Sequence, residues 1–208
     1  MSQTVVITGA SAGIGLELSK CFRAEGFQVL NIDQNAEGEH AFSADVSNES
    51  ALNQVVENIL RDYGKPSFWI NNAGISGTGA FGALSSEEFE KVIQVNFLGV
   101  IHGTRAAIRM MKEPESGTIV NISSVTGEIP TPFMAAYTAS KHAVTGFTRA
   151  LREELKQQGS GLRMVLVSPG FAKTAIMQPR HGMEFPKWME NMVADPHQVA
   201  KEIFEGLV

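Results

Sequence analysis

The chain has 208 residues, of which 43% are hydrophobic and 19% charged, and its net charge is −5. A chain of this length is typically one domain, and it can bury roughly 70% of its unfolded surface without a metal or disulfide staple. So much apolar side chain excludes intrinsic disorder. Because the chain is acidic and has no basic run, we expect no nucleic-acid partner.

The single cysteine and the short apolar runs argue against disulfides and membrane spans. Cys21 alone can form neither an internal disulfide nor a multi-cysteine zinc site, and its helical context predicts a buried small hydrophobe. Gly9 interrupts the apolar run that begins at Val5, and no stretch approaches the ~18 apolar residues that cross a bilayer. We therefore expect a cytoplasmic protein without a membrane partner.

The first half of the chain alternates between short apolar runs and helical patterns. Strands are predicted at residues 4–8, 27–32, 41–44 and 67–70. One helix is predicted at residues 14–24, and a second begins at Ser47, whose hydroxyl can cap it. The residues between Asp33 and Asp45 are too few for a helical crossover, so a loop is expected to join the second and third strands.

The second half continues the alternation. Ser85, with Glu88 three residues later, forms a capping-box pattern that predicts a long helix ending near Met111. Asp195 and Pro196 suit the start of a last helix, because Asp accepts free amide hydrogens and Pro fits the first turn. The remaining predicted elements are strands at 117–122 and 163–167 and a helix at 135–158.

Alternating strands and helices predict one α/β domain over residues 1–208, with a parallel sheet and helices on both faces. Together with the dinucleotide motif at residues 8–15, this predicts a doubly wound Rossmann-type fold with the strand order 3-2-1-4-5-6. The chain stops at Val208, directly after a helix, where a sheet of this type often adds one more strand. The expected fold therefore lacks that final strand, for a reason that the sequence leaves open.

A glycine-rich turn separates the first strand from the first helix. It reads Thr-Gly-Ala-Ser-Ala-Gly-Ile-Gly and spans residues 8–15. Its glycines let the backbone turn sharply and approach a diphosphate, while the helix N-terminus offers free amide hydrogens and a positive dipole end. A plain strand-to-helix turn is the alternative, which the strand-turn-helix context disfavours. The pattern predicts a dinucleotide site.

Asp33 ends the second strand, where a carboxylate can accept hydrogen bonds from both hydroxyls of the adenosine ribose. A 2′-phosphate would meet like charge there, and neither Ala12 nor Gln34 supplies a cation to offset it. Asp33 therefore favours NAD(H) over NADP(H), although an aspartate at a strand end is often only a turn former.

Tyr137 and Lys141 share one face of a predicted helix because they are four residues apart. An ammonium group beside a phenol stabilises the phenolate, so we expect a lowered tyrosine pKa and a general acid/base. Ser124 follows the strand at 117–122, and the carboxyl ends of parallel strands share one crevice. The three side chains should therefore converge near the glycine-rich turn.

These features together resemble the short-chain dehydrogenase/reductase family over nearly the whole chain. The resemblance is carried by the turn at 8–15, the Asn-Asn-Ala-Gly run at 71–74, Asn96, Ser124, Tyr137 with Lys141, and Ser-Pro-Gly at 168–170. It implies that Tyr137 exchanges a proton with the substrate alcohol or ketone and that Ser124 binds the same oxygen. Lys141 would hold the nicotinamide ribose and lower the tyrosine pKa. Asn96 would interrupt its helix and keep a water-linked proton path open.

The resemblance also implies a full cofactor site. Asp45 and Val46 would flank the adenine, and Pro169, Gly170 and Thr174 would contact the nicotinamide amide. The residues expected to bind the dinucleotide are Gly9, Ser11, Gly13, Ile14, Gly15, Asp33, Asp45, Val46, Asn72, Ala73, Gly74, Lys141, Pro169, Gly170 and Thr174.

Other residues give weaker signals. His102 and His142 lack a partner carboxylate or second histidine at metal spacing, so no metal site is predicted. The glycosylation pattern at 121–123 falls in a predicted buried strand, which argues against modification. Methionines and aromatics cluster at residues 175–194, where a substrate lid and a helix packed on the core or a second subunit are equal alternatives.

The sequence thus predicts an NAD(H)-dependent oxidoreductase that interconverts a secondary alcohol and a ketone of small to medium, partly apolar character. The alternatives are a dinucleotide-binding sensor or scaffold without turnover, and an epimerase or dehydratase, whose relatives generally carry a larger substrate domain. The helices at 86–111 and 135–158 resemble the pair through which family members associate, so a homodimer or homotetramer is expected.

Overall fold

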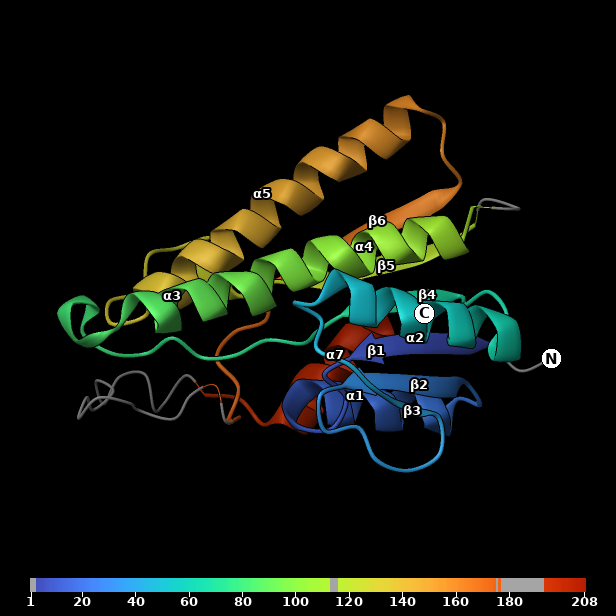
Figure 1. Ribbon diagram of the computed structural model, residues 1–208, viewed down its shortest axis with the longest axis horizontal. Helices are drawn as coiled ribbons and strands as arrows, with labels where there is room; N and C mark the ends of the chain where they lie inside the picture. The colour runs from blue at the N-terminus through green and yellow to red at the C-terminus, as the bar shows by residue number, and fades with distance from the viewer. Residues whose placement is uncertain (1–2, 113–115, 175, 177–192) are drawn as a thin grey trace.

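Six parallel strands form the centre of the molecule (Figure 1). They are β1 (Thr4–Thr8), β2 (Gln28–Asp33), β3 (Ala41–Ser43), β4 (Phe68–Asn71), β5 (Gly117–Ile122) and β6 (Leu162–Val167). Their order is β3-β2-β1-β4-β5-β6 and every pairing is parallel, which confirms the predicted sheet. The computed structural model describes residues 3–112, 116–174, 176 and 193–208.

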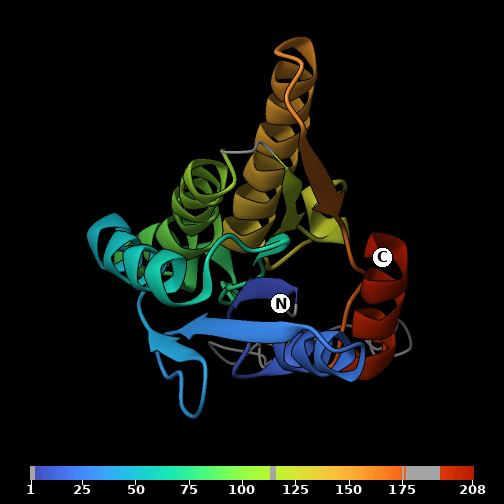
Figure 2. The same ribbon diagram turned by 90° about the vertical axis from the view of Figure 1, so that its right-hand side faces the viewer.

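Helices cover both faces of the sheet (Figure 2). On one face lie α1 (Gly13–Ala24) and α7 (Pro196–Leu207), and on the other lie α2 (Glu49–Tyr63), α4 (Gly99–Met110) and α5 (Ala135–Gln157). Neighbouring residues of β1 divide between two cores, because successive side chains of a strand point to opposite faces. Val6 packs with the α2 and α4 side, whereas Val5 and Ile7 pack with α1 and α7.

The structure modifies three local predictions. Asn48 caps α2 by accepting a hydrogen bond from the Ala51 amide at 3.1 Å, whereas Ser47 bonds to Asp45 instead. The predicted long helix is continuous but contains a π-helical stretch, η2 (Gln94–Leu98), between α3 (Ser86–Ile93) and α4. Cys21 is only partly buried against the core on the α1 face.

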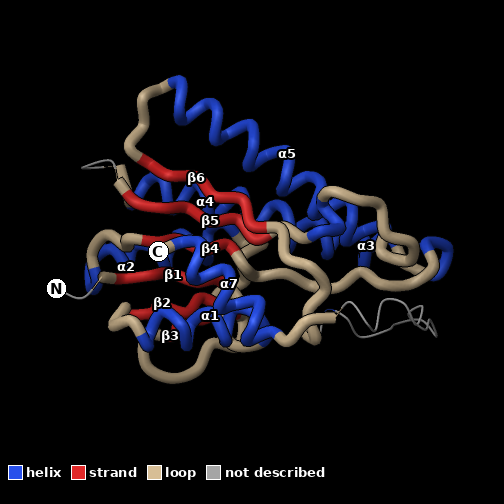
Figure 3. The backbone as a smooth tube through the Cα atoms, turned by 180° about the vertical axis from the view of Figure 1, so that it is seen from behind, coloured by secondary structure: helices blue, strands red, loops and turns tan. Residues whose placement is uncertain are grey.

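The segment after β6 runs along the edge of the sheet where the strands end. The tube in Figure 3 follows it from β6 across the carboxyl ends of the strands toward α7. Ala172 and Ala194 form an isolated parallel bridge, which holds the segment before α7 beside the segment after β6. Most of the predicted lid, residues 175 and 177–192, lies outside the described residues. The described residues form no seventh strand, and α7 is their last element.

Candidate active site

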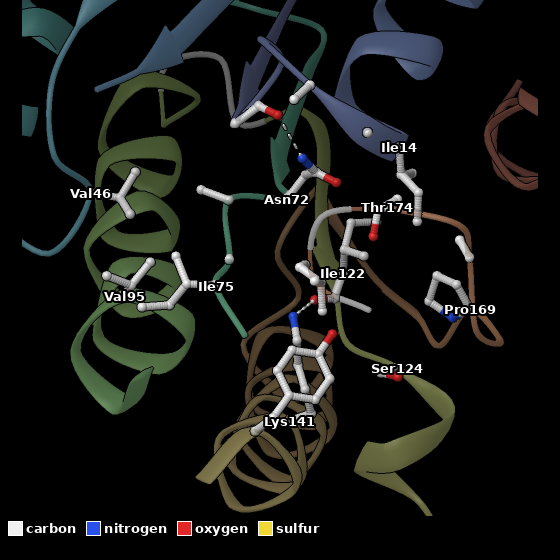
Figure 4. A pocket seen from close by; sticks show the side chains of 18 of the residues that line it. Ile14, Val46, Asn72, Ile75, Val95, Ile122, Ser124, Lys141, Pro169 and Thr174 are labelled. Carbon is white, nitrogen blue, oxygen red and sulfur yellow. Dashed lines mark hydrogen bonds between the residues drawn. The ribbon is translucent and has the colours of Figure 1, made fainter. Parts of the chain in front are cut away.

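A pocket of about 480 Å³ lies at the carboxyl ends of the strands. Its walls come from the segments that follow β1, β2, β4, β5 and β6 and from α5. Figure 4 labels Val46, Ile75 and Val95 along one wall and Ser124, Pro169 and Thr174 along the opposite wall. Parallel strands bring these segments to one edge, as expected for a ligand crevice in an open α/β sheet.

The glycine-rich turn between β1 and α1 packs against the segment after β4. Gly9 has a φ of +70°, and a Cβ there would lie 2.8 Å from Ala73 Cα. A Cβ on Gly15 would lie 2.3 Å from the Gly9 carbonyl oxygen. The Asn72 side chain donates to the carbonyl oxygens of Thr8 and Gly9 at 3.0 and 3.1 Å. Only glycine therefore fits at these positions.

The β2 end of the pocket contains one acidic residue among polar and apolar neighbours. Asp33 lines it, and one carboxylate oxygen accepts from the Asn35 amide at 3.0 Å. Val46 and Ala44 add apolar surface beside it. Among the described residues that line the pocket, Lys141 is the only cation, and it belongs to the opposite end.

Tyr137, Lys141 and Ser124 meet at the other end of the pocket. Tyr137 and Lys141 lie on the first turns of α5, and Ser124 precedes η3 (Val125–Gly127) after β5. The Lys141 ammonium donates to the Ile122 carbonyl oxygen at 2.8 Å and lies 5.6 Å from the centre of the Tyr137 ring. Ser124 lies near the Tyr137 hydroxyl and acts on it in the direction that lowers the tyrosine pKa. The convergence predicted from the sequence is therefore present.

Burial displaces the two titratable groups in opposite directions. It raises the pKa of Tyr137 to about 12, although Ser124 acts to lower that pKa. It lowers the pKa of Lys141 to about 8. The prediction that Lys141 lowers the tyrosine pKa is wrong for this structure, because loss of hydration disfavours the charged form of both groups.

Asn96 lies in the π-helical stretch η2 and is fully buried. Its side-chain oxygen accepts from the Ile75 amide at 2.7 Å, and its side-chain nitrogen donates to the Ile75 carbonyl oxygen at 3.0 Å. The same nitrogen donates to the Ser140 hydroxyl at 3.1 Å. Ser140 in turn donates to the Tyr137 carbonyl oxygen at 2.7 Å. Asn96 thus connects the pocket wall to the helix that carries Tyr137.

Most of the residues expected in the site line the pocket. Those that do not line it are Ser11, Gly15, Asp45 and Asn96. Gly15 allows the close packing of the turn, and Asp45 accepts from the amide and hydroxyl of Ser47. These two positions shape the pocket from outside its surface.

Sequence reasoning missed several residues of the site. Asn31 in β2 bonds to the glycine-rich turn, and Ser140 connects Asn96 with Tyr137. Ile75, Val95, Met134, Phe171 and Ile176 add apolar lining. Of these residues, only Asn31 carried a signal in the sequence, because it is a polar residue inside a predicted buried strand.

The structure also places the histidines and the glycosylation pattern that gave weaker signals in the sequence. His102 does have a carboxylate neighbour, contrary to the prediction: its Nε2 is 3.9 Å from Glu49 Oε2. His142 is exposed. Within the described ranges no three His, Cys, Asp or Glu side chains group as metal ligands, and Asn121 of the glycosylation pattern is fully buried. None of the helices in those ranges combines the length and hydrophobicity that a bilayer crossing requires.

Comparison with known proteins identifies the family. The short chain dehydrogenase family model matches residues 3–184. The chain therefore belongs to the short-chain dehydrogenase/reductase family, and it is an oxidoreductase of that class.

Individual relatives are moderately similar. The 2-(R)-hydroxypropyl-CoM dehydrogenase of Xanthobacter autotrophicus is 34% identical over 93% of this chain and 83% of its own length. A short-chain dehydrogenase/reductase from Burkholderia phymatum in complex with NAD is 27% identical, with a TM-score of 0.85 over 99% of this chain and 85% of that one. The 3-ketoacyl-(acyl-carrier-protein) reductase from Brucella melitensis complexed with NADH is 28% identical, with a TM-score of 0.85 over 97% and 88%. Other relatives are longer, so that this chain spans 58% of one and 61% of another.

Proposed function

We propose that this protein transfers a hydride between NAD(H) and a secondary alcohol or ketone. The observation that carries the proposal is the meeting of Tyr137, Ser124 and Lys141 in a pocket that also contains the glycine-rich turn. When bound, a nicotinamide dinucleotide supplies or accepts the hydride. Gly9, Gly13 and Ile14 line the pocket at the start of α1, where a helix N-terminus offers amide hydrogens to a diphosphate, so the residues suit this group.

The side chains divide the remaining work. Tyr137 acts as general acid in ketone reduction and as general base in alcohol oxidation, at the oxygen whose carbon takes or loses the hydride. Ser124 donates a hydrogen bond to that oxygen and stabilises its developing charge. Lys141 binds the ribose next to the nicotinamide. Asn96 holds the pocket wall at Ile75 in a fixed position relative to α5.

The cofactor preference follows from Asp33. A carboxylate at the end of β2 accepts hydrogen bonds from the adenosine ribose and repels a 2′-phosphate. The described lining residues near Asp33 include no cation to compensate that repulsion. We therefore assign NAD(H) as the preferred cofactor, held by the glycine-rich turn, Asp33, Val46, the 72–74 segment and the 169–174 segment.

The substrate is a small to medium alcohol or ketone with an apolar part. Met134, Phe171 and Ile176 line the pocket close to Tyr137 and offer no charged group. A panel of ketones and secondary alcohols, followed by nicotinamide absorbance with both cofactors, identifies the class and the favoured direction.

A second candidate function is a dinucleotide-binding sensor or scaffold without turnover. The glycine-rich turn and Asp33 alone are compatible with it. The joint presence of Ser124, Tyr137 and Lys141 favours an enzyme, because a sensor needs no buried acid/base group.

The decisive experiment removes one hydroxyl group. Tyr137→Phe is expected to lower kcat by about 10³-fold or more, since it deletes the proton donor, while the Kd for NADH changes by less than about twofold. Tyr63→Phe is the matched control, because Tyr63 bonds to His40 at 3.1 Å and does not line the pocket. Turnover retained by Tyr137→Phe removes Tyr137 from the mechanism. If the unmodified protein does not bind NADH, the proposal as a whole is wrong.

Self-association is part of the proposal. The α3-η2-α4 helix and α5 resemble the pair through which family members associate, and Leu98 on the first of these is 39% exposed. We expect a homodimer or homotetramer, measured as solution mass by light scattering. A mass equal to one chain at every concentration contradicts this assignment.

A further inference from the structure

A buried asparagine stands behind the glycine-rich turn. Asn31 lies in the middle of β2, in register with Ile7 of β1 and Ala41 of β3, and it is only 8% exposed. Its neighbour on the same face of the strand, Val29, belongs to the apolar core under α1 and α7. A buried amide costs free energy unless its polar atoms have partners, so the contacts of Asn31 indicate what it does.

The donors and acceptors fix the orientation of this amide. The Asn31 side-chain oxygen lies 3.1 Å from the Ala10 backbone nitrogen. A backbone N–H can only donate, so the oxygen of Asn31 must face it. The side-chain nitrogen therefore faces the Ser11 hydroxyl oxygen, at 3.0 Å, and donates to it. The amide thus bridges two consecutive residues of the glycine-rich turn.

This orientation decides the role of the Ser11 hydroxyl. Because its oxygen accepts from Asn31, its own hydrogen is directed to another acceptor. Ser11 is exposed at the start of the turn, between the pocket-lining residues Gly9 and Ala12. The acceptor that the proposed function supplies there is a ribose or phosphate oxygen on the adenosine half of the dinucleotide.

We propose that Asn31 is a positioning residue for dinucleotide binding: it holds the Ala10–Ser11 backbone and turns the Ser11 hydroxyl into a donor toward the adenosine half. This inference rests on the proposed function, because it needs a bound dinucleotide. It assigns Asn31 no contact with the nicotinamide, so its effect should fall on cofactor affinity and not on kcat.

The test measures NADH affinity by fluorescence titration of the full chain. Asn31→Leu has nearly the same shape but neither polar contact, and it is expected to weaken NADH binding roughly tenfold, the usual result of losing a buried hydrogen bond. The kcat at saturating NADH should stay within about twofold. Ser11→Ala should weaken NADH binding by a smaller factor, and the double variant should bind no more than about twofold more weakly than Asn31→Leu.

Two ligand fragments locate the effect. Adenosine monophosphate carries the adenosine ribose and one phosphate, so its inhibition constant should rise in Asn31→Leu. Nicotinamide mononucleotide, which lacks that half, should inhibit both proteins equally. If adenosine monophosphate binds equally well to both proteins, the proposed direction of the Ser11 hydroxyl is wrong.

A stability control separates positioning from general damage. Thr148→Val removes a fully buried hydroxyl that bonds to Asn121 and Val144, and Thr148 does not line the pocket. It should lower thermal stability while leaving the Kd for NADH unchanged. If Asn31→Leu behaves in the same way, Asn31 is only structural and the proposal is overturned.

A fallback variant and the unmodified protein complete the test. Asn31→Thr suits a strand and retains a hydroxyl near Ala10 but cannot reach Ser11, so it should also weaken NADH binding if Asn31→Leu does not fold. NADH binding unchanged in Asn31→Thr overturns the proposal. If the unmodified protein itself does not bind NADH, the proposed function is wrong. That result differs from a failure of the Asn31 proposal, in which the unmodified protein binds NADH and the variants bind it equally well.

Discussion

The two ends of the pocket differ in the groups that form them. At the β1–β2 end, the glycine-rich turn is held by neutral groups, and its shape comes from backbone packing of Gly9 and Gly15 against neighbouring segments. At the α5 end, two titratable side chains, Tyr137 and Lys141, are buried and their pKa values are displaced in opposite directions. Under the proposed function, the first end would hold the dinucleotide through a backbone shape that neighbouring side chains support, whereas the second would supply the chemistry through side chains whose burial costs free energy.

The largest expected effect concerns the turn. Gly15→Ala would place a Cβ 2.3 Å from the Gly9 carbonyl oxygen and 2.4 Å from the Asn72 side-chain nitrogen. Since neither backbone nor bonded amide can move away cheaply, we expect the free energy of unfolding to fall by about 3 kcal/mol. The NADH affinity should fall as well. Urea unfolding and fluorescence titration measure the two quantities.

A second glycine supplies the control. Gly146 lies within α5, and a Cβ there meets no atom within 4 Å. Gly146→Ala should therefore stabilise the helix by about 0.5 to 1 kcal/mol. If both substitutions have the same effect, the packing of Gly15 does not determine the shape of the turn.

The next prediction concerns Lys141. Its pKa in the folded protein is about 8, below the ordinary value of 10.5. Between these values the unfolded chain binds more protons than the folded protein, so stability rises with pH in that window and is lost as pH falls toward 8. Lys141→Met should remove a rise on the order of 2 kcal/mol between pH 8 and 10, measured by urea unfolding.

Tyr137 limits the pH window and provides the comparison variant. Its pKa is raised to about 12 from 10, so stability falls with pH between those values. Measurements below pH 10 avoid that opposing effect, and Tyr137→Phe should keep the rise between pH 8 and 10. Equal pH slopes in the unmodified protein and in Lys141→Met would show that burial does not shift the lysine.

The smallest expected effect concerns Asp33, which brings charge to the otherwise neutral end. Asp33→Ser should reduce the preference for NADH over NADPH by about tenfold in kcat/KM, because it removes the repulsion of the 2′-phosphate. Glu37→Gln is the control, since this exposed acidic residue does not line the pocket. If the unmodified protein uses both cofactors equally, Asp33 does not select the cofactor.

The β strands show how far local pattern reaches. The run at 4–8 is apolar and β-branched because β1 is buried on both faces, and the sequence therefore predicted it correctly. The capping box of Ser85 and Glu88 likewise forms at the start of α3. The cap of α2 was misplaced by one residue, because Ser47 and Asn48 are both suitable and a local hydrogen bond to Asp45, two residues earlier, engages Ser47.

The candidate catalytic side chains show what local pattern cannot predict. Spacing placed Tyr137 and Lys141 on one helix face, but their pKa values depend on how many segments bury them. The π-helical turn at Asn96 has no propensity signal, since it depends on bonds to Ile75 and Ser140 from other parts of the chain. Asn31 was missed because its partners lie 20 and 21 residues earlier in the chain.

By itself, the sequence determined the alternating strands and helices, the glycine-rich turn and the identity of the candidate catalytic side chains, because these follow from hydrophobic period and from residue types at short spacing. The tertiary structure decided the protonation energetics of Tyr137 and Lys141, the packing of Gly15 and the orientation of the Asn31 amide. Hydration loss and hydrogen-bond direction are properties of surroundings assembled from distant segments, so they exist only once the chain has folded.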